Sequence, residues 1–161
     1  MPRQTPLLLS AITFLGATLA PAPAALAGEC KVTNYGTLPI EMRGARPSTL
    51  VKVNGRETRF LVDTGAFFGT MSVATAKELG LRLEAAPAGL YGVGVGGSFS
   101  LQVTRVKELG ILGGTIPDIQ FTVGGSDVGM PVLGANVLHA VDLELDLARG
   151  QMRLMKPKGC D

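Results

Sequence analysis

The sequence predicts a mostly β protein, folded as a small closed barrel with one or two short helices. Three observations support this prediction. The chain has 161 residues, enough for one domain with a sizeable core. It is 46% hydrophobic and contains 22 glycines and 10 prolines, without a collagen period or a low-complexity run. Short runs of β-favouring residues alternate with turn residues, so the high glycine content indicates frequent turns rather than disorder.

The first 27 residues are predicted to be a secretory signal peptide, followed by a folded domain over residues 28–161. Arg3 is the only charge among them, and Leu7–Leu19 is an apolar run interrupted only by small or hydroxyl residues. Ala25-Leu26-Ala27 then has the small-x-small pattern of a cleavage site. An uncleaved anchor is the alternative, but the run is shorter than the roughly 20 residues that a membrane span needs. We therefore expect a periplasmic or secreted protein, with no membrane attachment after cleavage.

The two cysteines, Cys30 and Cys160, stand near the two ends of the mature chain. In an oxidising compartment they are predicted to form a disulfide, which requires the two ends to lie side by side. Closing a loop of about 130 residues would stabilise the fold by roughly 4–5 kcal/mol in the chain-entropy model. Two free thiols or intermolecular bridges are the alternative. Because the chain has only these cysteines and one histidine, His139, we expect no metal site and no cofactor.

The first half of the domain is predicted to build a β-hairpin. A first strand is expected at Leu38–Met42 and a loop at Arg43–Ser48. Two β-rich runs, Thr49–Val53 and Arg56–Val62, then flank Asn54-Gly55. Asn-Gly between two such runs is a strong hairpin signal, because a type I′ turn needs positive φ at both central positions.

The remaining elements are short and separated by turn residues. Ser72–Leu79 is predicted to be a helix, with Ser72 as its N-cap and Gly80 ending it. A glycine-rich hairpin is expected at Tyr91–Ser98, and a helical turn at Gly134–Leu138. Further strands are expected at Phe99–Leu109, Ile116–Val123, Val132–Leu133, Val141–Leu147 and Gln151–Met155.

The candidate chemistry centres on Asp63-Thr64-Gly65, which directly follows the apolar end of the predicted hairpin. A carboxylate at that place is costly if it is buried alone. On its own the tripeptide is unspecific, because an Asp that caps a turn at a strand end is common. A second segment, Val132–Leu138, lies about 70 residues downstream and strengthens the signal.

With these two segments the chain resembles the retropepsin family of aspartic proteases, in particular its bacterial single-domain, secreted members. The resemblance covers residues 49–154. The matching motifs are Leu61-Val62-Asp63-Thr64-Gly65-Ala66, the hairpin around Gly92–Gly97, and Val132-Leu133-Gly134-Ala135-Asn136. It implies a retropepsin-like (acid protease) barrel.

The resemblance also implies an aspartic endopeptidase that acts on a peptide or protein substrate, with Asp63, Thr64 and Gly65 as catalytic residues. Peptide hydrolysis by this route needs two carboxylates that share one proton. A chain with a single Asp-Thr-Gly must therefore form a homodimer, in which Asp63 faces its symmetry mate. One member of the pair would take a proton from water, and the other would polarise the scissile carbonyl.

The same resemblance implies the substrate-binding residues. The hairpin would close over the peptide through Tyr91, Gly92, Val93 and Gly94. The other predicted substrate-binding residues are Ala66, Phe67, Val132 and Leu133. Phe67 departs from the family, because many viral members carry a second Asp there. Phe67 and Phe68 are expected either to form apolar subsite walls or, for at least one of them, to fill the core.

Other functions are weighed against this one. The net charge of +2 and the absence of a basic stripe give no reason to expect a nucleic-acid partner. His139 is the only histidine and no Gly-x-Ser-x-Gly is present, which argues against a nucleophilic hydrolase. Two alternatives stay open. One is a catalytically inactive peptide-binding or assembly module on the same barrel, and the other is a domain of a longer protein.

Overall fold

The computed structural model describes residues 30–94, 97–124 and 129–159. The predicted signal peptide and Cys160 lie outside these residues. The described part is mostly strand with two short helices, as predicted. None of its helices has the length and apolar content needed to span a membrane.

The strands are β1 (Lys31–Pro39), β2 (Glu41–Arg43), β3 (Arg46–Val53), β4 (Arg56–Val62), β5 (Thr70–Met71), β6 (Glu84–Ala85), β7 (Tyr91–Gly94), β8 (Gly97–Ser100), β9 (Gln102–Ile111), β10 (Gly114–Val123), β11 (Val132–Leu133), β12 (Asp142–Asp146) and β13 (Gln151–Lys158). The helices are α1 (Val73–Glu78) and α2 (Ala135–Leu138).

Eight strands form the main sheet, in the order β2-β3-β4-β11-β5-β10-β9-β6. Strand β3 also pairs with β9 through Lys52 opposite Gly110 and Val53 opposite Leu109. This short pairing curls the sheet back on itself. The barrel is thus closed over only part of its length, where a fully closed one was expected, but the predicted fold class is confirmed.

The Asn54-Gly55 turn between β3 and β4 has the conformation that the sequence predicts. Asn54 has φ of 49° and Gly55 has φ of 84°, as a type I′ turn requires. Strand pairing runs from Val53 opposite Arg56 to Ser48 opposite Leu61. This register fixes where β4 ends and therefore where Asp63 lies.

The predicted helix is confirmed as α1, with the predicted cap. The Ser72 hydroxyl accepts a hydrogen bond from the Thr75 N–H at 3.0 Å, which satisfies one of the free donors of the first turn. Gly80 ends the helix with φ of 68°, a conformation that glycine adopts without strain. Ala76 is the one fully buried residue of this helix and packs into the core.

The core lies inside the curled main sheet. Phe60 of β4 and Phe121 of β10 are fully buried, with ring centroids 5.8 Å apart. They are surrounded by aliphatic side chains from the strands and both helices, among them Val53, Met71, Ala76, Val106, Leu109, Val123, Leu133 and Val137. Apolar burial of this kind is the main stabilising contribution to the fold.

Among the strand boundaries that differ from the prediction, three change the path of the chain. The expected strand Leu38–Met42 is split at Ile40, because the Ile40 N–H donates to the Gly150 carbonyl instead of continuing one ladder. The expected loop over Arg43–Ser48 is a tight turn at residues 44–45, after which β3 begins. The expected long strand from Phe99 is interrupted at Leu101, between β8 and β9.

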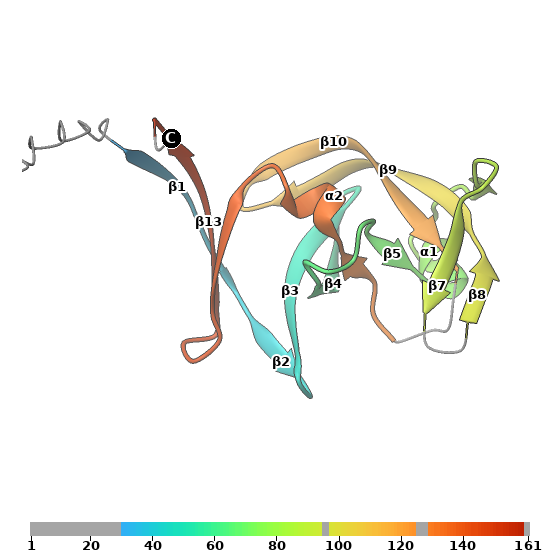
Figure 1. Cartoon of the computed structure of the whole chain (residues 1–161), viewed down its shortest axis with the longest axis horizontal. Coiled ribbons are helices and arrows are strands. Elements are labelled where there is room, and N and C mark those ends of the chain that lie inside the picture. Colours follow the sequence, from blue (N-terminus) through green and yellow to red (C-terminus); the bar gives the residue numbers. More distant parts are fainter. Residues whose placement is uncertain (1–29, 95–96, 125–128, 160–161) are drawn as a thin grey trace, which may run out of the picture.

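A separate three-stranded sheet has the order β1-β13-β12. Strand β1 begins at Lys31, in a segment for which no strand was predicted, and pairs with β13 along its whole length. Lys31 lies opposite Lys158, so the two ends of the described chain lie side by side. Figure 1 shows β1 and β13 together at one side of the molecule, away from β7 and β8.

The turn between β12 and β13 is held by Asp146 and Arg149. The Arg149 side chain and backbone N–H both bond to the Asp146 carboxylate, at 2.7 and 3.0 Å. The Arg149 side chain, with its backbone N–H next, lowers the pKa of Asp146 below its usual range. The turn therefore keeps its ion pair at pH values where an unpaired aspartate has begun to protonate.

Candidate active site

Two parallel strands bring the sequence motifs together. Strand β11 pairs with β4, with Val132 opposite Leu61 and Leu133 opposite Val62. Just past the end of β4, the Asp63 N–H donates to the Leu133 carbonyl at 3.1 Å. Two segments that are about 70 residues apart in the sequence thus meet at the point where the candidate catalytic residue leaves the sheet.

Asp63 begins a tight turn in which its carboxylate stays accessible. The Gly65 N–H donates to Asp63 Oδ1 at 2.9 Å, and the Ala66 N–H donates to the Asp63 carbonyl at 3.3 Å. Asp63 Oδ2 accepts no hydrogen bond from the residues that the structure describes, and the side chain is exposed. The turn orients one oxygen and leaves the other available for a group outside the chain.

The loop that follows this turn passes close to Gly134. There the backbone of Phe68 and Gly69 contacts the backbone just before α2. A Cβ atom at position 134 would lie 2.4 Å from the Phe68 carbonyl carbon and 2.6 Å from the Gly69 nitrogen. The backbone at Gly69 is held in place, because its carbonyl accepts from the Thr122 N–H at 2.9 Å and its N–H donates to the Asn136 side chain at 2.6 Å. Any residue larger than glycine at position 134 would therefore displace the loop that carries Asp63.

Hydrogen bonds from the start of α2 fix the same loop. The Ala135 N–H donates to the Ala66 carbonyl at 2.7 Å, and the Asn136 N–H donates to the Phe67 carbonyl at 3.1 Å. The Asn136 side chain adds two more bonds. Its Oδ1 accepts from the Gly69 N–H at 2.6 Å, and its Nδ2 donates to the Gln120 carbonyl at 2.8 Å. Asn136 thereby ties the loop to both α2 and β10.

Thr64 and Phe67 are the exposed side chains of this rigid loop beside Asp63. Thr64 is exposed, and its hydroxyl has no partner within the described part of the chain. Phe67 is 77% exposed, and its ring meets that of half-buried Phe68 edge to face, with centroids 4.9 Å apart. Phe67 therefore does not fill the core. It presents an apolar surface directly after Ala66, the last residue of the turn.

The predicted hairpin forms a two-stranded sheet of its own, β7 and β8, in which Tyr91 lies opposite Ser100 and Val93 opposite Ser98. Tyr91 and Val93 are 63% and 73% exposed. On the other face the Phe99 ring covers Gly92 so closely that a Cβ there would lie 2.3 Å from it. The hairpin thus has one face covered by its own Phe99, and a second face open to solvent on which Tyr91 and Val93 lie beside Ser100 and Ser98.

The structure brings most of the predicted site residues to one loop and its support. Asp63, Thr64, Gly65, Ala66 and Phe67 form the loop itself. The side chains of Val132 and Leu133 are buried, so these residues hold the loop through β11 rather than through an exposed surface. No hydrogen bond or ion pair joins the hairpin to the loop within the described ranges.

Sequence reasoning missed the part played by Asn136, although it lies in the matched motif. An Asn at the start of a helical turn is usually a local cap, and only the fold brings Gly69 and Gln120 within reach of it. His139 is exposed, and its Nδ1 contacts the Ala135 carbonyl at 3.0 Å. Within the described residues, no three His, Cys, Asp or Glu side chains gather in a way that could hold a metal ion.

The Asn136 side chain provides a test of this support. Asn136→Ala leaves the Gly69 N–H and the Gln120 carbonyl without partners, so we expect it to lower the free energy of unfolding by about 2–3 kcal/mol. Asn34→Ala is the control, because Asn34 makes one exposed bond to the Gly36 N–H and should cost well under about 1 kcal/mol. Urea unfolding of both variants measures the difference, and equal losses would contradict the assignment.

Comparison with known proteins agrees with this geometry. A family model described as "gag-polyprotein putative aspartyl protease" matches residues 49–140. A retropepsin-like aspartic protease from Rickettsia conorii is 19% identical with a TM-score of 0.57, and the match covers 81% of this chain and 95% of that chain. EIAV protease in complex with the inhibitor HBY-793 is 26% identical with a TM-score of 0.51, over 65% of this chain and 98% of that one. No curated protein sequence matches the chain.

The family model spans most of β3, the turn at Asp63, the hairpin and α2. The two solved structures share the same arrangement of strands over most of their own length. The predicted resemblance is therefore confirmed, and the chain belongs to the retropepsin-like aspartic protease family.

Proposed function

We propose that the protein is an aspartic endopeptidase whose active site forms between two copies of the chain. The observation that supports this proposal is the exposure and hydrogen bonding of the Asp63 carboxylate. The carboxylate is exposed at the end of a rigid loop, with Oδ1 held by the Gly65 N–H and Oδ2 open. A carboxylate that served only as a turn cap would not need a loop tied down by α2 and β11.

The chemistry requires a second carboxylate. Two aspartates in contact share one proton, because both cannot ionise easily at such a short distance. In the proposed homodimer, the ionised member takes a proton from the attacking water, and the protonated member polarises the scissile carbonyl. The open Oδ2 of Asp63 faces its mate, and the exposed Thr64 hydroxyl bonds across the two-fold axis.

The hairpin of β7 and β8 covers the bound peptide in the proposed active site. Its open face, with Tyr91 and Val93, lies over the bound peptide and excludes water from the reaction. Phe67 forms an apolar wall beside the catalytic turn, where burying its ring against a substrate side chain is favourable.

Substitution of the proposed catalytic group gives the first test. Asp63→Asn keeps an oxygen for the Gly65 N–H but cannot ionise, so we expect a loss of about 10²–10⁴-fold or more in kcat on a peptide library at acidic pH. The fold and the solution mass, measured by analytical ultracentrifugation, should match those of the wild-type dimer.

Asp118→Asn is the matched control, because Asp118 is another exposed carboxylate and pairs with Arg105 away from the loop. Its φ of 52° is one that Asn accepts readily. Cleavage that survives in Asp63→Asn, or a wild-type dimer that never cleaves, would contradict the proposal and favour the peptide-binding module.

We also propose that the mature chain is periplasmic or secreted, begins at residue 28 and carries a disulfide between Cys30 and Cys160. The pairing of Lys31 with Lys158 supports the bridge, because it holds the strands next to both cysteines together. An oxidising compartment would let the bridge form and persist.

Mass spectrometry of the protein from its native host tests both parts. We expect a chain that begins at Gly28 and is lighter by two hydrogens than its reduced form. A retained leader would contradict cleavage, and two alkylated cysteines without prior reduction would contradict the bridge.

A further inference from the structure

A cavity of about 390 Å³ lies between the main sheet and the three-stranded sheet of β1, β13 and β12. The three-stranded sheet contributes Leu38, Met152 and Leu154 to its wall. These side chains share one face, because Leu38 lies opposite Met152 and side chains two residues apart on a strand point the same way. The opposite wall comes from β9, β10, β11 and α2. Asp63 is not among the described residues that line the cavity, so it is separate from the exposed surface around that carboxylate.

The lining of this cavity is almost entirely apolar. None of the described residues that line it carries a charge, and Tyr35 and Thr115 are the only ones with a polar side chain. Both are exposed, whereas Leu133 and Met152 are buried, so the cavity reaches from the surface into the core. An apolar interior with few polar groups is typical of small-molecule sites, and the volume lies within their usual range of about 300–1,000 Å³.

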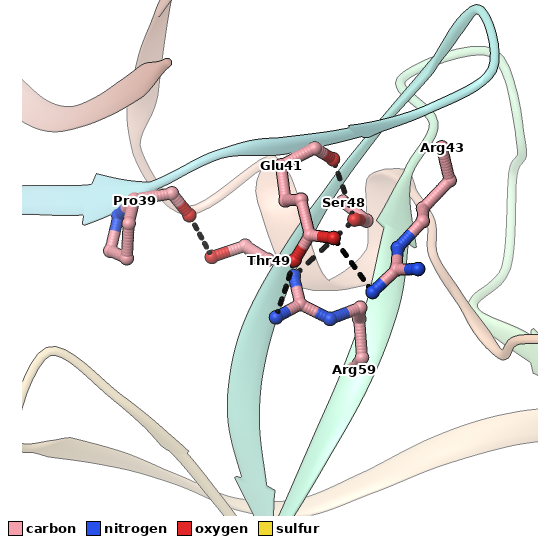
Figure 2. Close-up of polar contacts among 6 residues, drawn as sticks. All are labelled: Pro39, Glu41, Arg43, Ser48, Thr49 and Arg59. Atoms are coloured by element: carbon pink, nitrogen blue, oxygen red, sulfur yellow. Dashed lines mark hydrogen bonds and ion pairs between the residues drawn. The ribbon is translucent and has the colours of Figure 1, made fainter.

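The two walls are fixed relative to each other by the connection between β1 and β2. Figure 2 shows how this connection is fastened to β3 and β4. The Thr49 hydroxyl donates to the Pro39 carbonyl at 2.9 Å, and the Ser48 hydroxyl donates to the Glu41 carbonyl at 2.7 Å. Ser48 and Thr49 are fully buried, and Arg59 pairs with the Glu41 carboxylate at 2.9 Å. Swinging the three-stranded sheet inward to close the cavity would break these bonds and leave buried hydroxyls without partners, so the cavity is preformed.

Leu112 holds a strained conformation at the place where the two walls meet. It lies in the turn between β9 and β10 and has φ of 53°, which a leucine adopts only at a cost in free energy. Its side chain lines the cavity and lies against β1, where a Cβ on Gly36 would be 3.3 Å from it. Glycine or asparagine would adopt this φ more easily. The turn thus keeps a leucine whose side chain completes the apolar wall.

We propose that this cavity binds an uncharged aliphatic molecule. The chain of the ligand lies against Leu133 and Met152, and its polar end, a hydroxyl or an ester, stays at the mouth beside Tyr35. Burial of the chain removes apolar surface from water and is favourable. A charged head group would lose hydration there, because no described lining residue has a charge to pair with it. The ligand is a free molecule, since a lipid chain would have to leave its bilayer to reach Leu133. This inference does not depend on the proposed proteolytic function.

Binding of 1-decanol and of decanoate tests the proposal, because the two probes share a chain length and differ in head-group charge at neutral pH. Calorimetric titration of the wild-type protein should show saturable binding of one decanol per chain. Decanol should also raise the Tm, since it binds the folded state. Decanoate should bind at least about tenfold more weakly. In methyl NMR spectra decanol should shift the signals of Ile116 and Val137, which line the cavity, and leave that of Val73 in place.

Gly114→Leu is designed to block the cavity. Gly114 lines the cavity and lies opposite Ile111, another lining residue, so a side chain at position 114 shares that face. The only atom within 4 Å of a Cβ there is the Ile111 carbonyl oxygen, at 3.4 Å, which is an ordinary contact. The variant should therefore fold, which its cooperative unfolding without ligand checks. We expect it to bind decanol about tenfold or more weakly than the wild type, because the added side chain occupies the space of the ligand.

Thr33→Leu is the control, because it adds the same side chain at an exposed position of β1 that does not line the cavity. Its affinity for decanol should equal that of the wild type. The proposal would be overturned if decanol does not bind saturably, if decanoate binds equally well, or if Gly114→Leu keeps full affinity. Flotation with neutral phosphatidylcholine vesicles separates a free ligand from a membrane lipid. The protein should stay in solution, and flotation that Gly114→Leu abolishes would assign the cavity to a membrane and contradict the proposal.

Discussion

The candidate site depends on the close approach of the loop that carries Asp63 to Gly134. Only a residue without a Cβ lets the loop backbone lie against the start of α2, and this contact brings Ala66, Phe67 and Gly69 within hydrogen-bond reach of Ala135 and Asn136. This approach in turn requires β11 to lie beside β4 in parallel. The rigidity of the turn at Asp63 is thus a property of the whole sheet and not of the Asp63-Thr64-Gly65 tripeptide alone.

This arrangement explains how an exposed acid can be accurately placed. An aspartate on a free loop would sample many positions, whereas Asp63 leaves a strand whose neighbours Phe60, Leu61 and Val62 are buried. The core anchors one side of the turn, and α2 anchors the other. A preorganised group of this kind does not need to be reordered in the transition state, which is the main advantage of an enzyme over solution.

Local sequence signals predicted the turn and the helix cap that lie on either side of the candidate site. Asn54-Gly55 and Ser72 act through their nearest neighbours, and the structure confirms both. Most of strand β1 was missed because it has no alternating pattern and is held by β13, more than a hundred residues away. The role of Asn136 was missed for the same reason. Both depend on registers between strands and on contacts between distant segments, which residue spacing along one chain does not encode.

The central claim is that one chain holds half of an active site. Mixing wild-type protein with increasing amounts of Asp63→Asn, followed by subunit exchange, tests it most directly. If the site needs both aspartates, each mixed dimer is inactive, and the activity per wild-type chain falls towards zero as the variant is added in excess. Activity per wild-type chain that stays constant under complete exchange would contradict the account, because each protomer would then work alone.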